Sequence, residues 1–468
     1  MPHLFLVLGY LLSAACLPAI LLANRRPAAT WGWIWAIFLF PYAGPLFYFL
    51  LGSDRMQRKR LRNRRRHSLK APRRIRAGKA ATPDPGPEVE RNLVETLSAL
   101  NLQPSSSAEG VDLLSDGAAF YDALETAIAG ARETVHIEFF IWRDDEQGAR
   151  FRRLLADAAR RGVRVRLLLD EMGCSRLSRA YFRELLAAGG AFSWFGNVHP
   201  LRNRWTFGLR NHRKLQIVDG RAAFVGGMNL GREHLGLDPA RGRWRDLQVR
   251  VEGPVVRALE NTFADDWFFA TDEKIPAPAP FAGPEAAITV QVVEDGPDNR
   301  QHPMALSLEA LIGHARRRLW IASGYFLPTQ SLLDALKLAA ARGVEVRVLV
   351  SEKSDHFYVV EAGRSFYEEM LRYGIRVYEF HKDVNHAKVV LVDDKWTSVG
   401  SANFDNRSMY LNFELNLVFH DPGTAARAAA LLDGYYRHAE EIGLDRWLKR
   451  PFHRRLRESL FRPFGPVL

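Results

Sequence analysis

The sequence contains very little cysteine. Only Cys16 and Cys174 occur among its 468 residues, which excludes a disulfide framework and a multi-cysteine zinc or iron–sulfur site. No other set of residues has the spacing of metal ligands, so no metal and no other cofactor is expected. A hydrophobic content of 47% also excludes a disordered chain, because such a composition can bury a substantial core.

Acidic residues are missing from 55–79, a segment that holds 13 Lys and Arg residues. The whole chain carries a formal charge of +12, so +12 less +13 leaves −1 for the remainder. A nearly neutral body does not fit a protein that grips a polyanion along its surface, and no nucleic-acid partner is expected. The basic segment fits a topology signal, and equally a contact for anionic lipid head groups.

Charge is also missing from two apolar stretches, about 4–22 and 31–51. Each is about as long as a helix that crosses the hydrocarbon core, and the second has aromatic residues at both ends. We predict two membrane segments within 1–54, in a multi-pass protein of the cell (inner) membrane whose remaining chain stays cytoplasmic. A cleaved signal or a buried helical hairpin is the alternative, and Pro41 and Pro45 leave open a kinked or re-entrant second segment.

Two Pro-rich stretches without periodicity, 80–89 and 271–287, indicate linkers. After the membrane segments we therefore predict a basic juxtamembrane region with linker, a first domain, a Pro-rich linker, a second domain and a basic tail, at 55–109, 110–270, 271–287, 288–447 and 448–468.

The two predicted domains are copies of each other. AARRGVRVRLLLD at 158–170 matches AAARGVEVRVLVS at 339–351 at eight of thirteen positions. In both copies, β-branched and aromatic runs alternate with segments of helical apolar spacing that end at glycine. This alternation predicts an α/β fold, present twice, with helices packed on the faces of a largely buried sheet.

Each copy contains a histidine and a lysine two residues apart, followed by an aspartate and by a glycine-rich stretch that ends in asparagine. The residues are His212, Lys214, Asp219 and Asn229 in the first copy, and His386, Lys388, Asp393 and Asn403 in the second. A single HxK is weak evidence. Two copies of HxK-x4-D-x6-G-[GS]-x-N with every element at the same offset are strong evidence for a shared function.

The doubled motif resembles the signature of the phospholipase D superfamily. Within it the chain is similar to bacterial cardiolipin synthases, most specifically over GSANFDNRSMYLNFELNL at 400–417 and also at IEFFIWRDDEQG (137–148) and GYFLP (324–328). The resemblance implies two tandem phospholipase D-like α/β/α domains, packed with pseudo-twofold symmetry and preceded by a pair of transmembrane helices. It also places the His, Lys and Asp of both motifs in the catalytic signature.

The chemistry explains the residue types. Residues i and i+2 of a strand project from one face, so the His and Lys of each motif point the same way. If the halves pack face to face, two imidazoles and two ammonium groups surround one phosphate. One imidazole would then attack phosphorus, and the other would serve as general acid and base. The resemblance favours His212 as nucleophile and His386 as acid/base, with both lysines, Asn229 and Asn403 holding the phosphate oxygens.

Four carboxylates lie near the motifs. Asp246 and Glu414 occupy equivalent places on the next strand, where we expect each to orient the histidine of its own copy. Asp219 and Asp393 lie an odd number of residues past the lysine, so we expect them on the opposite strand face, tying the turn that follows. Other histidines are interpreted as ordinary surface or core residues: His199, His234, His302 and His356.

The first copy has extra residues just before its motif, within GNVHPLRNRWTFGLRN at 196–211. They include Arg202, Arg204, Trp205 and Arg210, which fit a contact with the bilayer or with an anionic head group. A solvated loop fits these residues equally well.

The resemblance implies an integral-membrane phosphatidyltransferase that condenses two phosphatidylglycerol molecules into cardiolipin and glycerol through a phosphatidyl-histidine. Membrane phospholipids are then its partners. A membrane-bound hydrolytic phospholipase D with the same catalytic residues is the alternative, and a superfamily nuclease is disfavoured by the apolar segments and the neutral body. The sequence leaves open whether phosphatidylethanolamine replaces one phosphatidylglycerol, and it leaves open the oligomeric state.

Overall fold

The computed structural model describes residues 2–23, 27–51, 86–101, 103–196, 210–238, 242–276, 286–299, 301–354 and 356–465. The chain forms two compact units, Met1–Arg73 with Gly196–Leu209, and Arg74–Phe195 with Arg210–Leu468. The basic segment 55–79 and the predicted contacts Arg202, Arg204 and Trp205 lie outside the described residues.

The described part of the first unit contains three apolar helices, α1 (Pro2–Leu22), α2 (Pro27–Leu39) and α3 (Ala43–Leu51). The second predicted membrane segment is therefore two helices, and Pro41 lies in the break between them, where a residue without a backbone N–H is tolerated. Within the described part of the chain, no helix combines the length and the apolarity needed to cross a bilayer.

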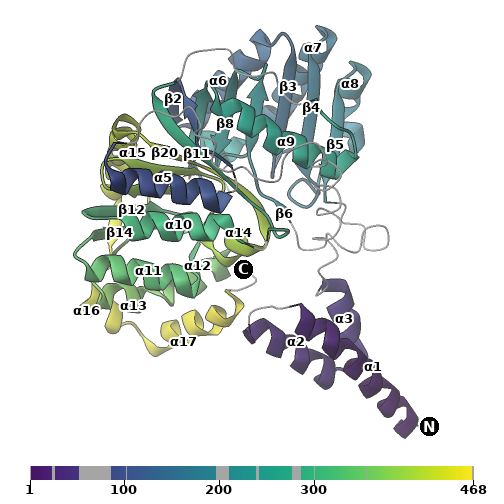
Figure 1. Ribbon diagram of the computed structural model, residues 1–468, viewed down its shortest axis with the longest axis vertical. Helices are drawn as coiled ribbons and strands as arrows, with labels where there is room; N and C mark the ends of the chain where they lie inside the picture. Colours follow the sequence, from purple (N-terminus) through teal and green to yellow (C-terminus); the bar gives the residue numbers. More distant parts are fainter. Residues whose placement is uncertain are drawn as a thin grey trace. The chain divides into compact units, whose positions relative to one another are not determined.

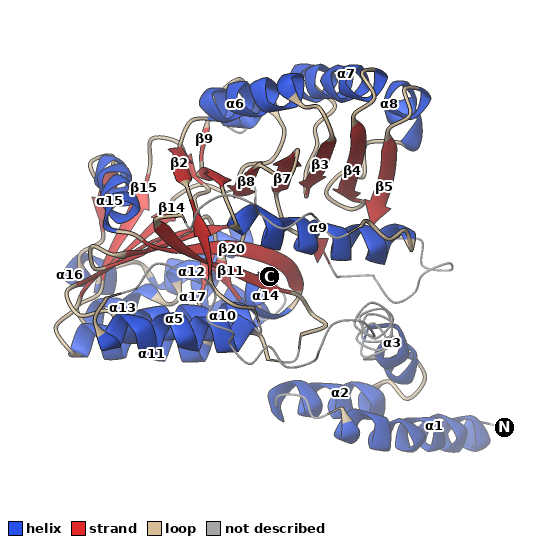
Figure 2. Ribbon diagram, turned by 45° about the horizontal axis from the view of Figure 1, so that its top comes forward, coloured by secondary structure: helices blue, strands red, loops and turns tan. Residues whose placement is uncertain are grey.

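The first half of the second unit is a seven-stranded sheet with helices on both faces (Figure 1). Its elements are β2 (Gly110–Leu114), α6 (Gly117–Gly130), β3 (Thr134–Phe139), α7 (Glu146–Arg160), β4 (Arg164–Asp170), α8 (Arg183–Ala187), β5 (Ala191–Phe195), β7 (Leu215–Val218), β8 (Ala222–Gly226), β10 (Gln248–Glu252) and α9 (Val255–Thr271). The order is β2-β10-β8-β7-β3-β4-β5. Strands β3, β4 and β5 are parallel, and the other pairs are antiparallel. Figure 2 shows α6, α7 and α8 on one face and α9 on the other.

The second half repeats this plan. Its main elements are β11 (Ile288–Asp295), α10 (Pro303–His314), β12 (Arg318–Ala322), α11 (Gln330–Ala341), β14 (Glu345–Ser351), α12 (Phe357–Arg364), α13 (Tyr367–Arg372), β15 (Arg376–Phe380), β17 (Val389–Val392), β18 (Trp396–Gly400), α14 (Asn406–Tyr410), β20 (Asn412–His420), α15 (Pro422–Tyr436) and β21 (Ala439–Glu441). The sheet order is β1-β11-β20-β18-β17-β12-β14-β15-β21, in which β1 is Ser106–Ala108. The parallel trio β12, β14 and β15 matches β3, β4 and β5, so the predicted duplication of an α/β unit is confirmed.

Part of the predicted linker is folded. Residues 88–101 form α5 (Glu88–Asn101), and β1 pairs with β11 of the second half. Leu93, Val94 and Leu97 are buried in the core of that half, because their spacing places them on one helix face. The segment that precedes the first domain in sequence therefore completes the second domain in space.

Candidate active site

Both HxK motifs lie in extended segments where the two halves meet. The first follows β6 (Arg210–Asn211) and the second follows β16 (Val384–Asn385), so the predicted position within a strand is wrong. These short strands pair with the opposite half, β6 with β20 and β16 with β9 (Trp244–Arg245). The N–H of His212 donates to Phe413 O at 2.9 Å, and that of His386 donates to Arg245 O at 2.7 Å. The motif backbone is thus held by the other half instead of by its own sheet.

One cavity of about 320 Å³ brings the two motifs together. His212 and Asn229 of the first half line it, and so do His386 and Asn403 of the second. Its wall is partly aromatic: the Phe140 ring lies 4.9 Å from that of His212. The structure therefore places both motif histidines and both predicted phosphate-binding asparagines in a single cavity, whereas the two lysines predicted to converge with the histidines are not among the residues that line it.

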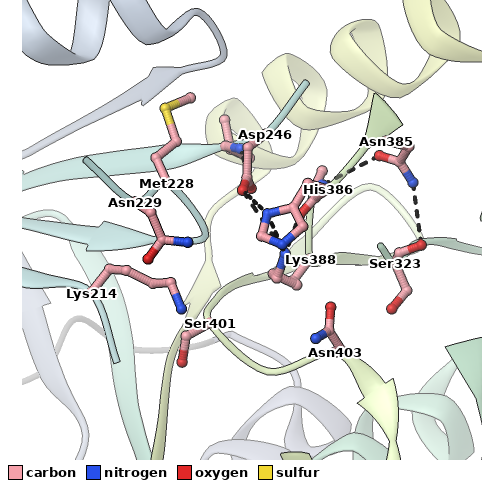
Figure 3. A network of polar contacts seen from close by, with 12 residues as sticks. Lys214, Met228, Asn229, Asp246, Ser323, Asn385, His386, Lys388, Ser401 and Asn403 are labelled. Carbon is pink, nitrogen blue, oxygen red and sulfur yellow. Dashed lines mark hydrogen bonds and ion pairs between the residues drawn. The ribbon is translucent and has the colours of Figure 1, made fainter. Parts of the chain in front are cut away.

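Both motif lysines are buried beside this cavity. Lys214 Nζ donates to His212 O at 2.5 Å, and Lys388 Nζ donates to His386 O and lies 2.9 Å from His386 Nδ1. Figure 3 shows Lys214, Lys388 and the two asparagines around His386. Two buried ammonium groups favour a bound anion, because charges interact strongly where water is excluded, although the buried carboxylates Asp246 and Glu414 lie nearby and offset part of this charge.

The carboxylates that orient the histidines come from the opposite halves. His212 Nδ1 donates to both oxygens of Glu414 at 3.0 and 3.1 Å, and His386 Nδ1 donates to Asp246 Oδ2 at 2.5 Å (Figure 3). The prediction that each carboxylate serves its own copy is wrong. The crossed pairing follows from the strands, since β6 lies beside β20 and β16 lies beside β9. Each histidine thus needs both halves to be correctly oriented.

The two histidine–carboxylate pairs differ electrostatically. Burial lowers the pKa of His212, and the adjacent Glu414 partly opposes this. Burial and the Lys388 ammonium lower the pKa of His386 much further. Burial raises the pKa of Asp246, whereas for Glu414 the effect of burial is outweighed by His212 and Lys214, which lower the pKa of its carboxyl. The two histidines are thus held in unlike surroundings, but the lower pKa belongs to His386, so the free protein favours a neutral His386. An acid role for His386 therefore requires a bound phosphodiester anion that stabilises its imidazolium.

Burial lowers the pKa of Lys214 to about 7, with a contribution from Lys388 and opposition from Glu414. As pH rises through 7, the free enzyme should lose this positive charge, so we expect kcat/KM for a phosphodiester lipid to fall. A bound phosphate stabilises the ammonium, so the corresponding fall in kcat should lie at higher pH. Initial rates from pH 5 to 9 at low and saturating substrate test this. A kcat/KM that stays level to pH 9 would contradict it.

Asp219 and Asp393 lie in turns outside the cavity lining. The Asp219 carboxylate accepts the N–H groups of 132–134 at 2.7 to 2.9 Å, and Asp393 accepts those of 316–318 at 2.8 to 3.2 Å. These N–H groups precede β3 and β12. Each aspartate therefore joins its own turn to the start of the neighbouring strand, which supports a structural role over a chemical one.

Arg213 was not singled out from the sequence, although it stands between His212 and Lys214. Its side chain is 1% exposed and pairs with Asp266 of α9. It also donates to the carbonyl groups of Asp295 and Glu414 at 3.0 and 3.1 Å. The second copy has an alanine at the equivalent position. The presence of an arginine in only one copy was the feature of the sequence that could have indicated a special role for Arg213. Arg213 connects the first motif to the strand that carries Glu414.

Further residues of the cavity wall were also missed or undervalued. Arg407, which was not singled out from the sequence, lines the cavity, as does His356, which had been interpreted as an ordinary residue. Arg210, which the sequence suggested as a head-group contact, also lines it. The side chains of Ser401 and Asn412 hold Glu414, with Ser401 Oγ donating at 2.5 Å and Asn412 Nδ2 at 3.2 Å. Ser401, Arg407 and Asn412 lie within the stretch GSANFDNRSMYLNFELNL that resembles a known family, but the resemblance does not show which of these side chains point into the cavity.

Two HxK histidines facing one anion-attracting cavity between duplicated α/β domains define a phospholipase D-type phosphodiester site. A family model described as "Cardiolipin synthase, PLD-like domain" matches residues 124–267 and 308–435. A second, described as "Phospholipase_D-nuclease N-terminal", matches residues 11–53.

Curated relatives match nearly the whole chain. It is 35% identical over 457 residues to a cardiolipin synthase of Geobacillus kaustophilus, with 96% of this chain and 91% of the relative covered. It is 33% identical to the major cardiolipin synthase of Bacillus subtilis, with 99% and 98% covered. The chain belongs to the cardiolipin synthase family of the phospholipase D superfamily.

A solved structure supports the fold independently. The phosphatidylserine synthase of Haemophilus influenzae superposes with a TM-score of 0.63 at 14% identity, covering 81% of this chain and all of that one. At this identity the likeness concerns the fold alone; the two tandem phospholipase D-like domains are shown by the family model, which matches one segment in each half.

Proposed function

We propose that this protein is a cardiolipin synthase that transfers a phosphatidyl group from one phosphatidylglycerol to the head-group hydroxyl of another. The observation that carries the proposal is the single cavity lined by His212 and His386, each oriented by a carboxylate of the opposite half. A reaction at one phosphorus that needs a nucleophile on one side and an acid on the other fits this arrangement.

In the first half-reaction, His212 Nε2 attacks phosphorus while the bond from phosphorus to the head-group glycerol oxygen breaks. Hydrogen bonding of Nδ1 to Glu414 leaves the Nε2 lone pair available, and the ionised Glu414 stabilises the positive charge that the phosphorylated ring acquires. The bound phosphate anion and Asp246 stabilise a protonated His386 against the lowering of its pKa by burial and Lys388, and His386 donates this proton to the departing glycerol. Lys214, Lys388, Asn229 and Asn403 stabilise charge on the non-bridging oxygens.

In the second half-reaction, a hydroxyl of the second phosphatidylglycerol attacks the phosphatidyl-histidine. His386, now neutral, takes the hydroxyl proton, the bond between phosphorus and nitrogen breaks, and cardiolipin leaves. Asp246 stabilises the imidazolium of His386 in both steps. Two phosphatidylglycerol molecules thus yield one cardiolipin and one glycerol, and both residues return to their starting states.

The cavity wall supports an anionic acceptor lipid. Arg210 and Arg407 both line the cavity and are close enough to affect each other's charge. Guanidinium groups bind phosphate oxygens well, so this pair suits the phosphate of the lipid whose hydroxyl attacks. Water needs no such site, which favours transfer over hydrolysis.

Changing Arg210 to Ala should therefore impair the acceptor more than the chemistry. We expect KM for phosphatidylglycerol to rise about tenfold, the loss of one hydrogen bond to a charged group, and phosphatidic acid to increase as a share of product. Thin-layer separation of labelled products measures both effects. Arg257→Ala, on the exposed face of α9, is the matched control. An unchanged KM and product ratio in Arg210→Ala would contradict the assignment.

The first unit supports attachment to a membrane. Its helices expose many large apolar side chains to solvent, including Leu8, Leu11, Leu12, Trp31, Trp35, Leu39, Phe40 and Phe47. Exposed apolar surface of this extent marks an interaction site. We propose that this unit embeds in the inner membrane, with the catalytic domains cytoplasmic, and alkaline carbonate extraction tests it. Release into the soluble fraction would contradict integration.

The test of the proposed activity supplies purified full-length protein with radiolabelled phosphatidylglycerol in mixed micelles. Labelled cardiolipin and free glycerol are the expected products. Phosphatidic acid as the main product would instead support a hydrolytic phospholipase D, which shares these catalytic residues. Adding phosphatidylethanolamine as a second lipid then shows whether it replaces one phosphatidylglycerol as donor.

A further inference from the structure

The C-terminal helix α17 (Phe452–Phe461) packs on the second half through its polar side. Arg457 donates to both oxygens of Glu361 at 2.9 and 2.7 Å. Glu458 is buried and accepts from Arg450 Nε at 2.9 Å. A helix on a globular protein ordinarily buries its apolar stripe, whereas α17 packs through these polar groups and Phe461 and leaves its other large apolar side chains exposed.

The other side of α17 carries a row of solvent-exposed apolar side chains. Phe452 is 75% exposed, Leu456 57% and Leu460 61%, and their spacing of four residues places them along one face. Phe464 continues the row, and Phe357 of α12 is 65% exposed and lies 5.7 Å from the Phe461 ring. We call these five residues the α17 apolar face. A single exposed apolar side chain is normal on a protein surface, but several large ones close together indicate an interaction site.

This face adjoins the wall of the catalytic cavity. Phe461 packs with Tyr325 and Tyr358 around the buried Val359. Both tyrosines and Val359 line the cavity. The Tyr325 ring lies 6.4 Å from that of His386. A surface that binds the α17 apolar face would therefore lie beside the cavity that receives the lipid.

The charged residues around the α17 apolar face indicate what kind of surface binds to it. Residues 446–462 contain seven basic side chains, Arg446, Lys449, Arg450, Arg454, Arg455, Arg457 and Arg462, and a single acidic one, Glu458. Four of the basic groups pair with carboxylates, Arg446 with Glu440, Arg450 with Glu458, Arg457 with Glu361 and Arg462 with Glu369, so the positive charge beside the face comes mainly from Lys449, Arg454 and Arg455. Exposed apolar residues flanked by basic ones are typical of helices that lie in the interface of an anionic bilayer. A second copy of this chain would bring the same basic residues against each other.

We infer that the α17 apolar face docks onto an anionic phospholipid bilayer and holds the cavity of the catalytic domains at the lipid surface. The inference deepens the proposed function, on which it depends for the lipid substrate. The α1–α3 unit can hold the chain on the membrane but leaves open which side of the catalytic domains meets the lipid. The α17 face would decide that orientation.

A probe on α17 tests docking without reference to activity. Both native cysteines are buried, so an exposed introduced cysteine can be labelled selectively with an environment-sensitive fluorophore. Full-length Leu456→Cys is reconstituted into phosphatidylcholine–phosphatidylglycerol vesicles that contain a nitroxide lipid, and Arg454→Cys, on another side of the same helix, is the matched control. An interfacial helix sits about 5–10 Å into the head-group boundary, so quenching should be strong at 456 and weak at 454.

Equal quenching at both positions, or none at 456, would overturn the inference. A disulfide between two copies at position 456 without lipid quenching would assign the face to self-association and overturn it as well. Because this readout needs no turnover, it is independent of whether the protein proves to be a synthase.

Activity provides the second test. The double variant Leu456→Ser, Leu460→Ser should raise the apparent KM on phosphatidylglycerol vesicles about 100-fold, a factor of about ten for each leucine that is no longer buried in the bilayer. Its rate on monomeric short-chain phosphatidylglycerol should equal that of the native protein, since neither residue lines the cavity. Equal losses on both substrates would place the face in folding or chemistry and contradict docking. A native protein that makes no cardiolipin from either substrate would refute the proposed function, while the fluorescence result would still stand.

Discussion

Cardiolipin formation should fall by at least about 10⁴-fold when His212 is changed to Ala. A loss of this size is typical when the nucleophilic residue of an enzyme that forms a covalent intermediate is removed. The reason is geometric: the mutation removes the only group that the account assigns to attack phosphorus, while His386 keeps its partner Asp246. The His386→Ala variant should lose a similar factor, because glycerol then departs without a proton. Product formation from labelled phosphatidylglycerol over hours measures both rates.

His356→Ala is the matched control, because this histidine also lines the cavity but has no role in the proposed chemistry. Its kcat should stay within about tenfold of the native value, a loss far smaller than that of a general acid or base. Thermal unfolding of all three variants checks that the fold survives. A His212→Ala enzyme with near-native turnover would contradict the assignment of both histidines to one reaction.

The second large effect is expected at the crossed carboxylates. Glu414→Gln preserves the size and shape of the side chain, but it replaces one of the two oxygens that accept from Ser401 and Asn412 with an NH2 group, and it removes the charge that stabilises the His212 ring. We expect kcat to fall about 10²–10⁴-fold, by analogy with other carboxylates that orient a catalytic histidine. The Asp246→Asn variant should behave similarly through His386. Single-turnover rates measure the effect.

Asp393→Asn is the contrasting variant. It weakens the acceptor for three backbone N–H groups, so the free energy of unfolding should drop by about 1–3 kcal/mol, with kcat nearly unchanged in the folded protein. Urea unfolding and initial rates separate the two quantities. If Asp393→Asn abolished turnover in a folded enzyme while Glu414→Gln was silent, the roles assigned to these carboxylates would be exchanged.

Much of the catalytic fold was predictable from local patterns. The alternation of strand and helix is written in the spacing of apolar residues, and the duplicated HxK motif identifies two equivalent halves. Convergence of His212 and His386 followed from the chemistry of a phosphodiester, which needs groups on both sides of one phosphorus. Local sequence patterns predict the two α/β halves, and known reactivity predicts that the two histidines converge. Neither prediction depends on which strands of one half pair with the other half.

The crossed pairing was not predictable in this way. Glu414 and His212 are brought together by the parallel pair β6–β20, whose strands lie about 200 residues apart in the chain, and nothing in either segment names its partner. The same holds for α5, which lies within the segment predicted to be a juxtamembrane region with linker and which packs on the second half. Contacts between distant segments depend on the whole topology, so a motif can show which residues act without showing which half supplies each one.

The most direct test of the central claim uses the His386→Ala variant with phosphatidyl-p-nitrophenol, whose leaving group departs without a proton donor. The account predicts a burst of one p-nitrophenolate per active site, followed by a stable phosphatidyl adduct on His212 that intact-mass and peptide analysis can locate. The adduct persists because no base activates the incoming alcohol. A burst from His212→Ala, or no adduct in His386→Ala, would contradict it.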